Sequence, residues 1–149
     1  MIRYKLQVDS SLLGLILPYL SQAFGESVAS REHSRAIPPS SGDDELNASW
    51  KEGLEEEGRA DRLSLVRLFE NPSLKNGLVE IPEEEAEEVL RSITDLRIFI
   101  REKNLESVSD EDLENGLVDI PRLGPLEGTA YLGYLLLAEV QERLIAEMI

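Results

Sequence analysis

The stretch NGLVEIPEEEAEEVLRSITDLRIFI, at residues 76–100, predicts a turn, a short strand and a helix in immediate succession. Asn76 and Gly77 are residue types that tolerate positive φ, so they favour a turn. The Leu-Val-Glu-Ile run that follows is typical of a brief strand. Pro82 then suits the first turn of a helix, because its φ is already fixed and its missing N–H would have no partner there.

The helix expected after Pro82 is amphipathic and extends to Asn104. Its five glutamates, at positions 83, 84, 85, 87 and 88, lie where the helix dipole favours anions, and Lys103 lies at the opposite end. Its apolar residues fall on one side and comprise Ala86, Val89, Leu90, Ile93, Leu96, Phe99 and Ile100. One face of this helix should therefore pack against the core.

The letters of this corner recur as NGLVDIP at residues 115–121. The second copy predicts another turn and a short strand at 117–120, after which Pro125 and Gly128 should delay a helix until Thr129. Because the likeness fades soon after the proline, we interpret the copies as two similar corners, with duplication of a strand–helix unit as the alternative. A solenoid needs at least three repeats. The two strands are expected to pair with each other or with a strand near the N-terminus.

The first part of the chain predicts a strand and then a helix. Residues 2–8 alternate apolar and polar side chains, which indicates a half-buried strand. Asp9 or Ser10 can cap a helix that runs through Phe24, and Pro18 should kink that helix because its ring removes a backbone donor. The residues expected on the inner face are Leu12, Leu13, Leu15, Ile16, Leu17 and Leu20.

Residues 30–44 are rich in Ser, Pro and Gly and poor in apolar residues, so a mobile loop is expected there. Asp43 or Asp44 would then cap a second helix, which Asn71 and Pro72 should end. The apolar residues that this helix presents are Leu46, Trp50, Leu54, Leu63, Val66 and Phe69.

The C-terminal helix is unusually apolar. Leu135, Leu136 and Leu137 alone span about 200° of the helix surface. A surface helix needs an apolar stripe only somewhat wider than about 100°. The simpler interpretation is a central helix covered on most sides, and the alternative is a homodimer that uses the Leu137 flank.

These segments predict a mainly α fold. We expect a single domain, residues 1–149, built as a bundle of about four helices with a minor β-sheet. The sheet would form from short strands near 2–8, 78–81 and 117–120. A chain of 149 residues is long enough to bury one hydrophobic core.

The charge of the chain is strongly acidic, with 30 Asp and Glu against 15 Lys and Arg, for a net charge of −15. This charge repels phosphate groups, so neither nucleic acid nor a membrane is an expected partner. A solubilising surface is the simpler interpretation, and an acidic mimic of nucleic acid that binds a basic partner is the alternative. The absence of cysteine excludes disulfides and thiolate metal sites, and it suits a reducing cytoplasm.

No catalytic or metal-binding motif is present in the sequence. His33 is the single histidine and has no cysteine, second histidine or serine motif to act with. The run DEDLEN at 110–115 begins like a calcium loop, but Asn115 and Pro121 replace the glycine and glutamate that such a loop requires. We therefore expect no metal, no cofactor and no enzymatic activity, with an enzyme that uses a carboxylate-based site as the alternative.

Several motifs carry a resemblance to a known family. They are RLF at 67–69, VEI at 79–81, ITDLRIFI at 93–100 and YLGYLLLAEVQERL at 131–144. In this order they resemble an uncharacterised bacterial family, the domain of unknown function numbered two thousand and seventeen. The resemblance covers roughly residues 46–149, with a looser fit over the first helix. The loop at 30–44 and the second NGLVDIP copy depart from that pattern. The polar positions that carry the resemblance are Asp95, Arg97, Tyr131 and Gln141, and Asp95 and Arg97 are expected to form a structural ion pair or a cap.

Genes of that family often lie beside the gene of ClpS, the adaptor of a Clp protease. The resemblance therefore implies a soluble, cytoplasmic bacterial protein with a link to regulated proteolysis. Because the sequence combines apolar helices with no catalytic constellation, we predict a non-enzymatic interaction or regulatory module. Its expected partner is an unidentified protein or a second copy of the chain.

Overall fold

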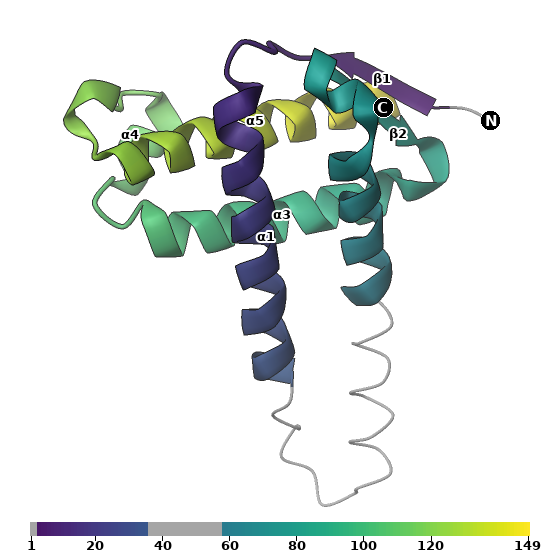
Figure 1. The fold of residues 1–149 in the computed structure, drawn as a ribbon, viewed down its shortest axis with the longest axis horizontal. Coiled ribbons are helices and arrows are strands. Elements are labelled where there is room, and N and C mark those ends of the chain that lie inside the picture. The colour runs from purple at the N-terminus through teal and green to yellow at the C-terminus, as the bar shows by residue number, and fades with distance from the viewer. Residues whose placement is uncertain (1–2, 36–57) are drawn as a thin grey trace, which may run out of the picture.

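A computed structural model of the chain describes residues 3–35 and 58–149. Within these ranges the chain is mainly helical, with one two-stranded antiparallel sheet (Figure 1). This arrangement confirms the predicted fold class. The start of the predicted second helix, with Leu46, Trp50 and Leu54, lies outside the described residues, as does the 36–44 part of the predicted loop. No helix in the described ranges is long and apolar enough to cross a membrane.

The sheet joins β1 (Arg3–Gln7) to β2 (Leu78–Pro82), with Leu6 directly opposite Val79. Gly77, just before β2, has a φ of 83°, so the predicted turn is present, with its glycine in the left-handed region. A Cβ on Gly77 would also collide with the backbone oxygen of Val8, whose N–H donates to the Gly77 oxygen across 2.8 Å. The first NGLVEIP copy therefore needs glycine for two independent reasons.

The second copy does not form the strand predicted at 117–120. Gly116 has a φ of 67° and ends the short helix α4 (Asp110–Asn115), after which the chain is irregular up to a 3-10 helix at Ile120–Arg122. Leu117 is 70% exposed, and the structure places no second strand beside this stretch within the described ranges. The prediction was wrong because a strand requires a neighbour, and only β2 has one, in β1.

Helix α1 (Leu13–Arg35) is longer than predicted, since it continues past Phe24 and includes residues 30–35 of the predicted loop. It also runs through Pro18. Its inner face consists of Leu13, Ile16, Leu20 and Ala23. Leu12 and Leu15 were both predicted to face inward, but both are exposed. Leu12 lies in the turn before the helix, and the helical period places Leu15 on the flank.

Residues 58–70 are helical, and the helix ends before Asn71 and Pro72 as predicted. The Asn71 side chain accepts a hydrogen bond from the Ser73 N–H across 3.0 Å and caps the following 3-10 helix, Pro72–Asn76. The buried residues of the 58–70 helix include Leu65 and Leu68, whereas Leu63, predicted on the inner face, is exposed. The observed inner face is therefore rotated about the helix axis relative to the predicted one.

The centre of the fold is formed by α3 (Ala86–Asn104) and α5 (Pro125–Met148), which lie side by side, with α1 crossing both (Figure 1). A 3-10 turn at Glu83–Glu85 leads from β2 into α3. The predicted inner stripe of α3 is largely confirmed, with Leu90 and Phe99 only partly buried. The short helix α4 lies at the end of this layer opposite the sheet (Figure 1).

Helix α5 begins earlier than predicted and uses Leu137 differently. Pro125 occupies its first position, where the missing N–H costs nothing, so the helix is not delayed until Thr129. Leu137 is 3% exposed within one chain, whereas Leu135 is 40% exposed. That side chain packs into the core of its own chain, as the central-helix interpretation expects, so it does not offer the flank that the homodimer alternative would use. Whether the chain forms a homodimer stays a prediction. The central position expected for this helix agrees with its contacts to α1, α3 and β1.

Candidate functional site

A groove of about 780 Å³ lies between α3, α4 and α5, and we refer to it as the α3–α4–α5 groove. Its walls combine apolar side chains, two arginines and four carboxylates. The lining residues are Arg97, Arg101, Asp110, Leu113, Glu114, Asn115, Gly116, Tyr134, Leu135, Ala138, Glu139 and Glu142.

Arg97 connects the two central helices at this groove. Its Nη1 donates to Gln141 Oε1 across 2.6 Å, and its Nη2 donates to the Tyr134 hydroxyl across 3.2 Å. The guanidinium also lies 4.7 Å from the centroid of the Tyr134 ring, within the range of a cation–π interaction. Gln141 in turn donates to the Thr94 hydroxyl across 2.5 Å. These contacts fix the register of α5 against α3 on one wall of the groove.

The structure brings together two of the four polar positions singled out from the sequence, Arg97 and Gln141. Arg97 bonds Gln141 and Tyr134, whereas Asp95, two residues earlier on α3, leaves the helix about 200° further round and has an interaction of its own. Tyr131 is buried in the core. Tyr134 was missed, although it precedes Gln141 by two helical turns and therefore shares its face of α5.

The rim of the groove carries an excess of negative charge. Arg101 donates to Asp110 Oδ1 across 2.6 Å and to the Leu105 carbonyl, so its charge is matched and α4 is tied to α3. Glu139 pairs only at 3.7 Å with Arg143, one turn further along α5. Glu114 and Glu142 have no ion-pair partner within the described ranges. The groove therefore presents apolar and acidic side chains together.

A second polar cluster joins α1 to the end of α3. The Tyr19 hydroxyl donates to Asn104 Oδ1 across 2.7 Å, and Lys103 pairs with Glu26 across 2.7 Å. Burial, together with the nearby Glu26 carboxylate, raises the pKa of Tyr19 to about 12. The hydrogen bond from Lys103 lowers the pKa of Glu26. This cluster orients α1, and its Lys103 and Asn104 also line a cavity beside the end of α3.

Two smaller cavities flank the central helices. One of about 160 Å³ includes Ser64, whose hydroxyl donates to Glu88 across 2.6 Å, and the other, of about 540 Å³, lies around Lys103 and Leu126. Within residues 3–30 and 58–149, the groups with a shifted pKa are Asp9, Tyr19, Glu26 and Arg91, and none of them lines these three cavities. In the part of the chain that the structure describes, no three acidic or histidine side chains gather as metal ligands would. The side chain of His33 lies outside that part.

Residues 17–148 match the family described as domain of unknown function, DUF2017. The match begins in α1, where the resemblance indicated a looser fit, and it spans both residues 30–44 and the second NGLVDIP copy. No curated protein and no solved structure matches the chain. Because the match extends from α1 to the last residue of α5, the chain belongs to the DUF2017 family of domains of unknown function.

Proposed function

We propose that the protein is a non-enzymatic interaction module whose α3–α4–α5 groove binds a segment of another protein. The observation that carries this proposal is the composition of the groove, in which Leu113 and Leu135 lie beside carboxylates at the rim. An exposed leucine in a hollow of this size offers apolar area to an inserted side chain.

The charge of the groove favours a basic partner. Four carboxylates line it against two arginines, and Arg101 is already paired with Asp110. Glu114 on α4 and Glu142 on α5 remain available in the groove. The net charge of −15 would also steer a basic segment toward the surface and speed its association at low salt. The proposed ligand is therefore a segment that combines Lys or Arg with Leu, Ile or Met.

Selection of random peptides on the immobilised chain tests this proposal. We expect the recovered sequences to be enriched in basic and apolar residues, and we expect their binding to weaken as salt increases. Glu142→Lys reverses a charge on the rim and should weaken binding several-fold. Glu147→Lys makes the same change further along α5, outside the groove, and should have little effect. Enrichment in acidic residues, or equal binding by both variants, would contradict the proposal.

The link to Clp-type proteolysis that the family resemblance implies remains a prediction. Purified ClpS can be titrated against the chain in the same assay. Saturable binding that Glu142→Lys weakens would support the link, and an absence of binding at concentrations far above those of the selected peptides would count against it.

A further inference from the structure

The α3–α4–α5 groove lies on the side of α5 that faces away from α1. Helix α1 crosses in front of α3 and α5 in Figure 1, and it meets α5 at Gly133, where an added Cβ would lie 3.0 Å from the Leu20 side chain. Leu135 follows two residues later, so it points about 200° away from Gly133. Its side chain is 40% exposed and lines the groove.

Two exposed isoleucines extend the apolar surface of the groove along both central helices. Ile98 falls between the groove-lining Arg97 and Arg101 on α3 and is 52% exposed. Ile145 follows the groove-lining part of α5 by about one turn and is 44% exposed. At a rise of about 1.5 Å per residue, the apolar surface from Leu135 to Ile145 is about 15 Å long. A helical segment of about three turns matches this length.

The walls of the groove offer almost no backbone partners to an extended segment. The lining residues belong to α3, α4 and α5, whose backbone groups bond within each helix, with the exception of Gly116. Gly116 caps α4, and its own N–H donates to the Asp112 carbonyl. An extended segment buried here would leave its N–H and C=O groups without partners, which is costly. A helix satisfies its own backbone, so it can enter the groove without this cost.

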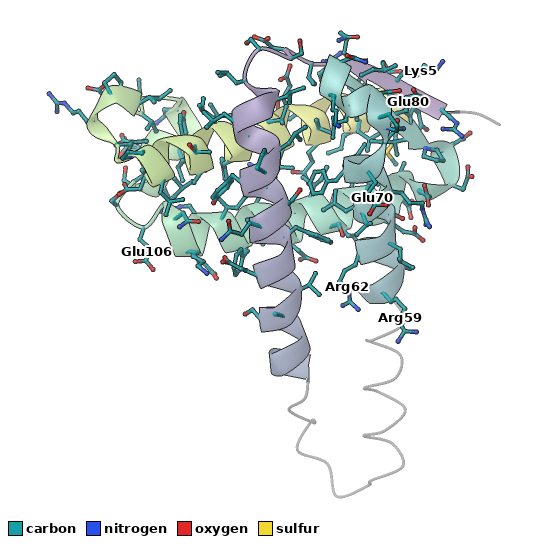
Figure 2. The ribbon with its side chains drawn as sticks, viewed as in Figure 1. Lys5, Arg59, Arg62, Glu70, Glu80 and Glu106 are labelled. Carbon is teal, nitrogen blue, oxygen red and sulfur yellow. The ribbon has the colours of Figure 1, made fainter. Side chains whose placement is uncertain are left out.

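The charges at the groove favour a helix with basic flanks. Glu114 on α4 and Glu142 on α5 line the groove and have no ion-pair partner within the described ranges. The basic side chains labelled in Figure 2 lie elsewhere, with Lys5 on β1 and Arg59 and Arg62 on the 58–70 helix, and none of them lines the groove. Lys or Arg on both sides of an apolar stripe would therefore meet carboxylates on α4 and α5.

We propose that the ligand of the α3–α4–α5 groove is a basic amphipathic helix of another protein, about three turns long, whose apolar stripe packs on Leu135, Ile98 and Ile145. Such a helix would add to α3 and α5 as helices ordinarily pack, with its apolar residues between theirs. This inference rests on the proposed function and adds the conformation of the ligand to it.

Two labelled peptides of identical composition test that conformation. In LKKLLKKLLKKLLK the leucines recur with the helical period, whereas in LKLKLKLKLKLKLK they alternate as in a strand. Fluorescence anisotropy with the full chain should show that the helical-period peptide binds at least about tenfold more tightly, or about 1.4 kcal/mol. A proline in the middle of the helical-period peptide should abolish its binding, because proline breaks a helix.

Substitutions in the chain test where the helical-period peptide lies. Ile98→Ala, Ile145→Ala and Glu142→Lys should each weaken its binding several-fold. The matched controls are Leu63→Ala, at a leucine that is 47% exposed on the 58–70 helix, and Glu147→Lys, and both should change binding little. All five side chains are exposed, so circular dichroism of the chain should be unchanged in every variant.

Equal binding of the two peptides, or tighter binding of the alternating one, would overturn the helical ligand, and a loss with Glu142→Lys would then leave the groove as the binding site. Absence of saturable binding by the helical-period peptide would also overturn the helical ligand alone, since selection of random peptides would still test the groove. Binding of the helical-period peptide that neither Ile98→Ala nor Glu142→Lys weakens would place it elsewhere, and would overturn both this inference and the proposed function.

Discussion

Arg97 on α3 and Gln141 on α5 form a hydrogen bond of 2.6 Å that joins the two central helices at the wall of the groove. The Arg97 Nε is buried and makes no hydrogen bond, so the side chain depends on its Nη contacts to Gln141 and Tyr134. A guanidinium held by neutral partners gains from charge-assisted hydrogen bonds without an ion pair. This contact therefore links the stability of the fold to the geometry of the groove.

Removal of either partner should destabilise the protein. Arg97→Met and Gln141→Leu should each lower the free energy of unfolding by about 2 kcal/mol, because a hydrogen bond to a charged group contributes about 1.5–3 kcal/mol. Urea denaturation of the single and double variants gives the coupling energy, which should be clearly non-zero. Arg122→Met, at an exposed arginine, is the control and should change little. Strictly additive effects would show that the two residues do not interact.

The placement of Leu137 and Leu135 gives opposite expectations for the same substitution. Leu137→Glu should abolish folding, because it places a carboxylate in an apolar core that offers no partner. Leu135→Glu should retain the helical circular dichroism spectrum and change the unfolding midpoint only slightly, since the side chain is 40% exposed. A folded Leu137→Glu variant would place that flank of α5 at the surface.

The two left-handed glycines should differ in their tolerance of alanine. Gly116→Ala should lower the free energy of unfolding by about 1–2 kcal/mol, which is the cost of a left-handed conformation for alanine. No steric cost is added, because no atom lies within 4 Å of the new Cβ. Gly77→Ala should lower the free energy of unfolding by clearly more, because a collision of the new Cβ with the Val8 backbone adds to the same conformational cost. Urea unfolding of both variants measures the difference. Equal costs would contradict the close approach at Gly77.

Tyr19 should make stability depend on pH in the alkaline range. Its pKa is about 12 in the folded chain against 10.0 ordinarily, so between these values the unfolded chain loses the phenol proton first. The contribution of the protonated Tyr19 to the free energy of unfolding is complete below pH 10 and is lost as the pH rises through 12. Tyr19→Phe should be less stable near pH 7, since it loses the bond to Asn104, but its stability should fall less between pH 10 and 12. Parallel curves of unfolding free energy against pH would refute this assignment.

Local chemistry was sufficient to predict the corner at Gly77, Pro82 and α3, because a glycine turn, a proline and a run of glutamates act within a few residues. The same reasoning failed at 117–120, since pairing depends on which segment lies alongside and not on the letters themselves. For Leu137 the sequence left two interpretations open, a central helix and a homodimer flank, because three adjacent leucines do not define which side of an apolar helix is buried. Only the neighbouring helices decide which of the three is buried.

The candidate site was only partly visible in the sequence for a related reason. Arg97 and Gln141 were singled out, but their contact joins residues on different helices, and no local pattern reports it. Tyr134 could have been found from its two-turn spacing to Gln141. The groove itself depends on where α4 lies relative to α3 and α5, which the run DEDLEN did not indicate, because its acidic residues resembled an incomplete calcium loop more than a capped helix.

Hydrogen–deuterium exchange of the chain, with and without a selected basic peptide, tests the central claim most directly. The account predicts slower exchange in α4 and in the part of α5 from Tyr134 to Glu142, with α1 and the 58–70 helix unchanged. The protected segments should lose that protection in Glu142→Lys and keep it in Glu147→Lys. Protection confined to α1 or the 58–70 helix, with the α3–α4–α5 groove unaffected, would contradict the claim that this groove binds the partner.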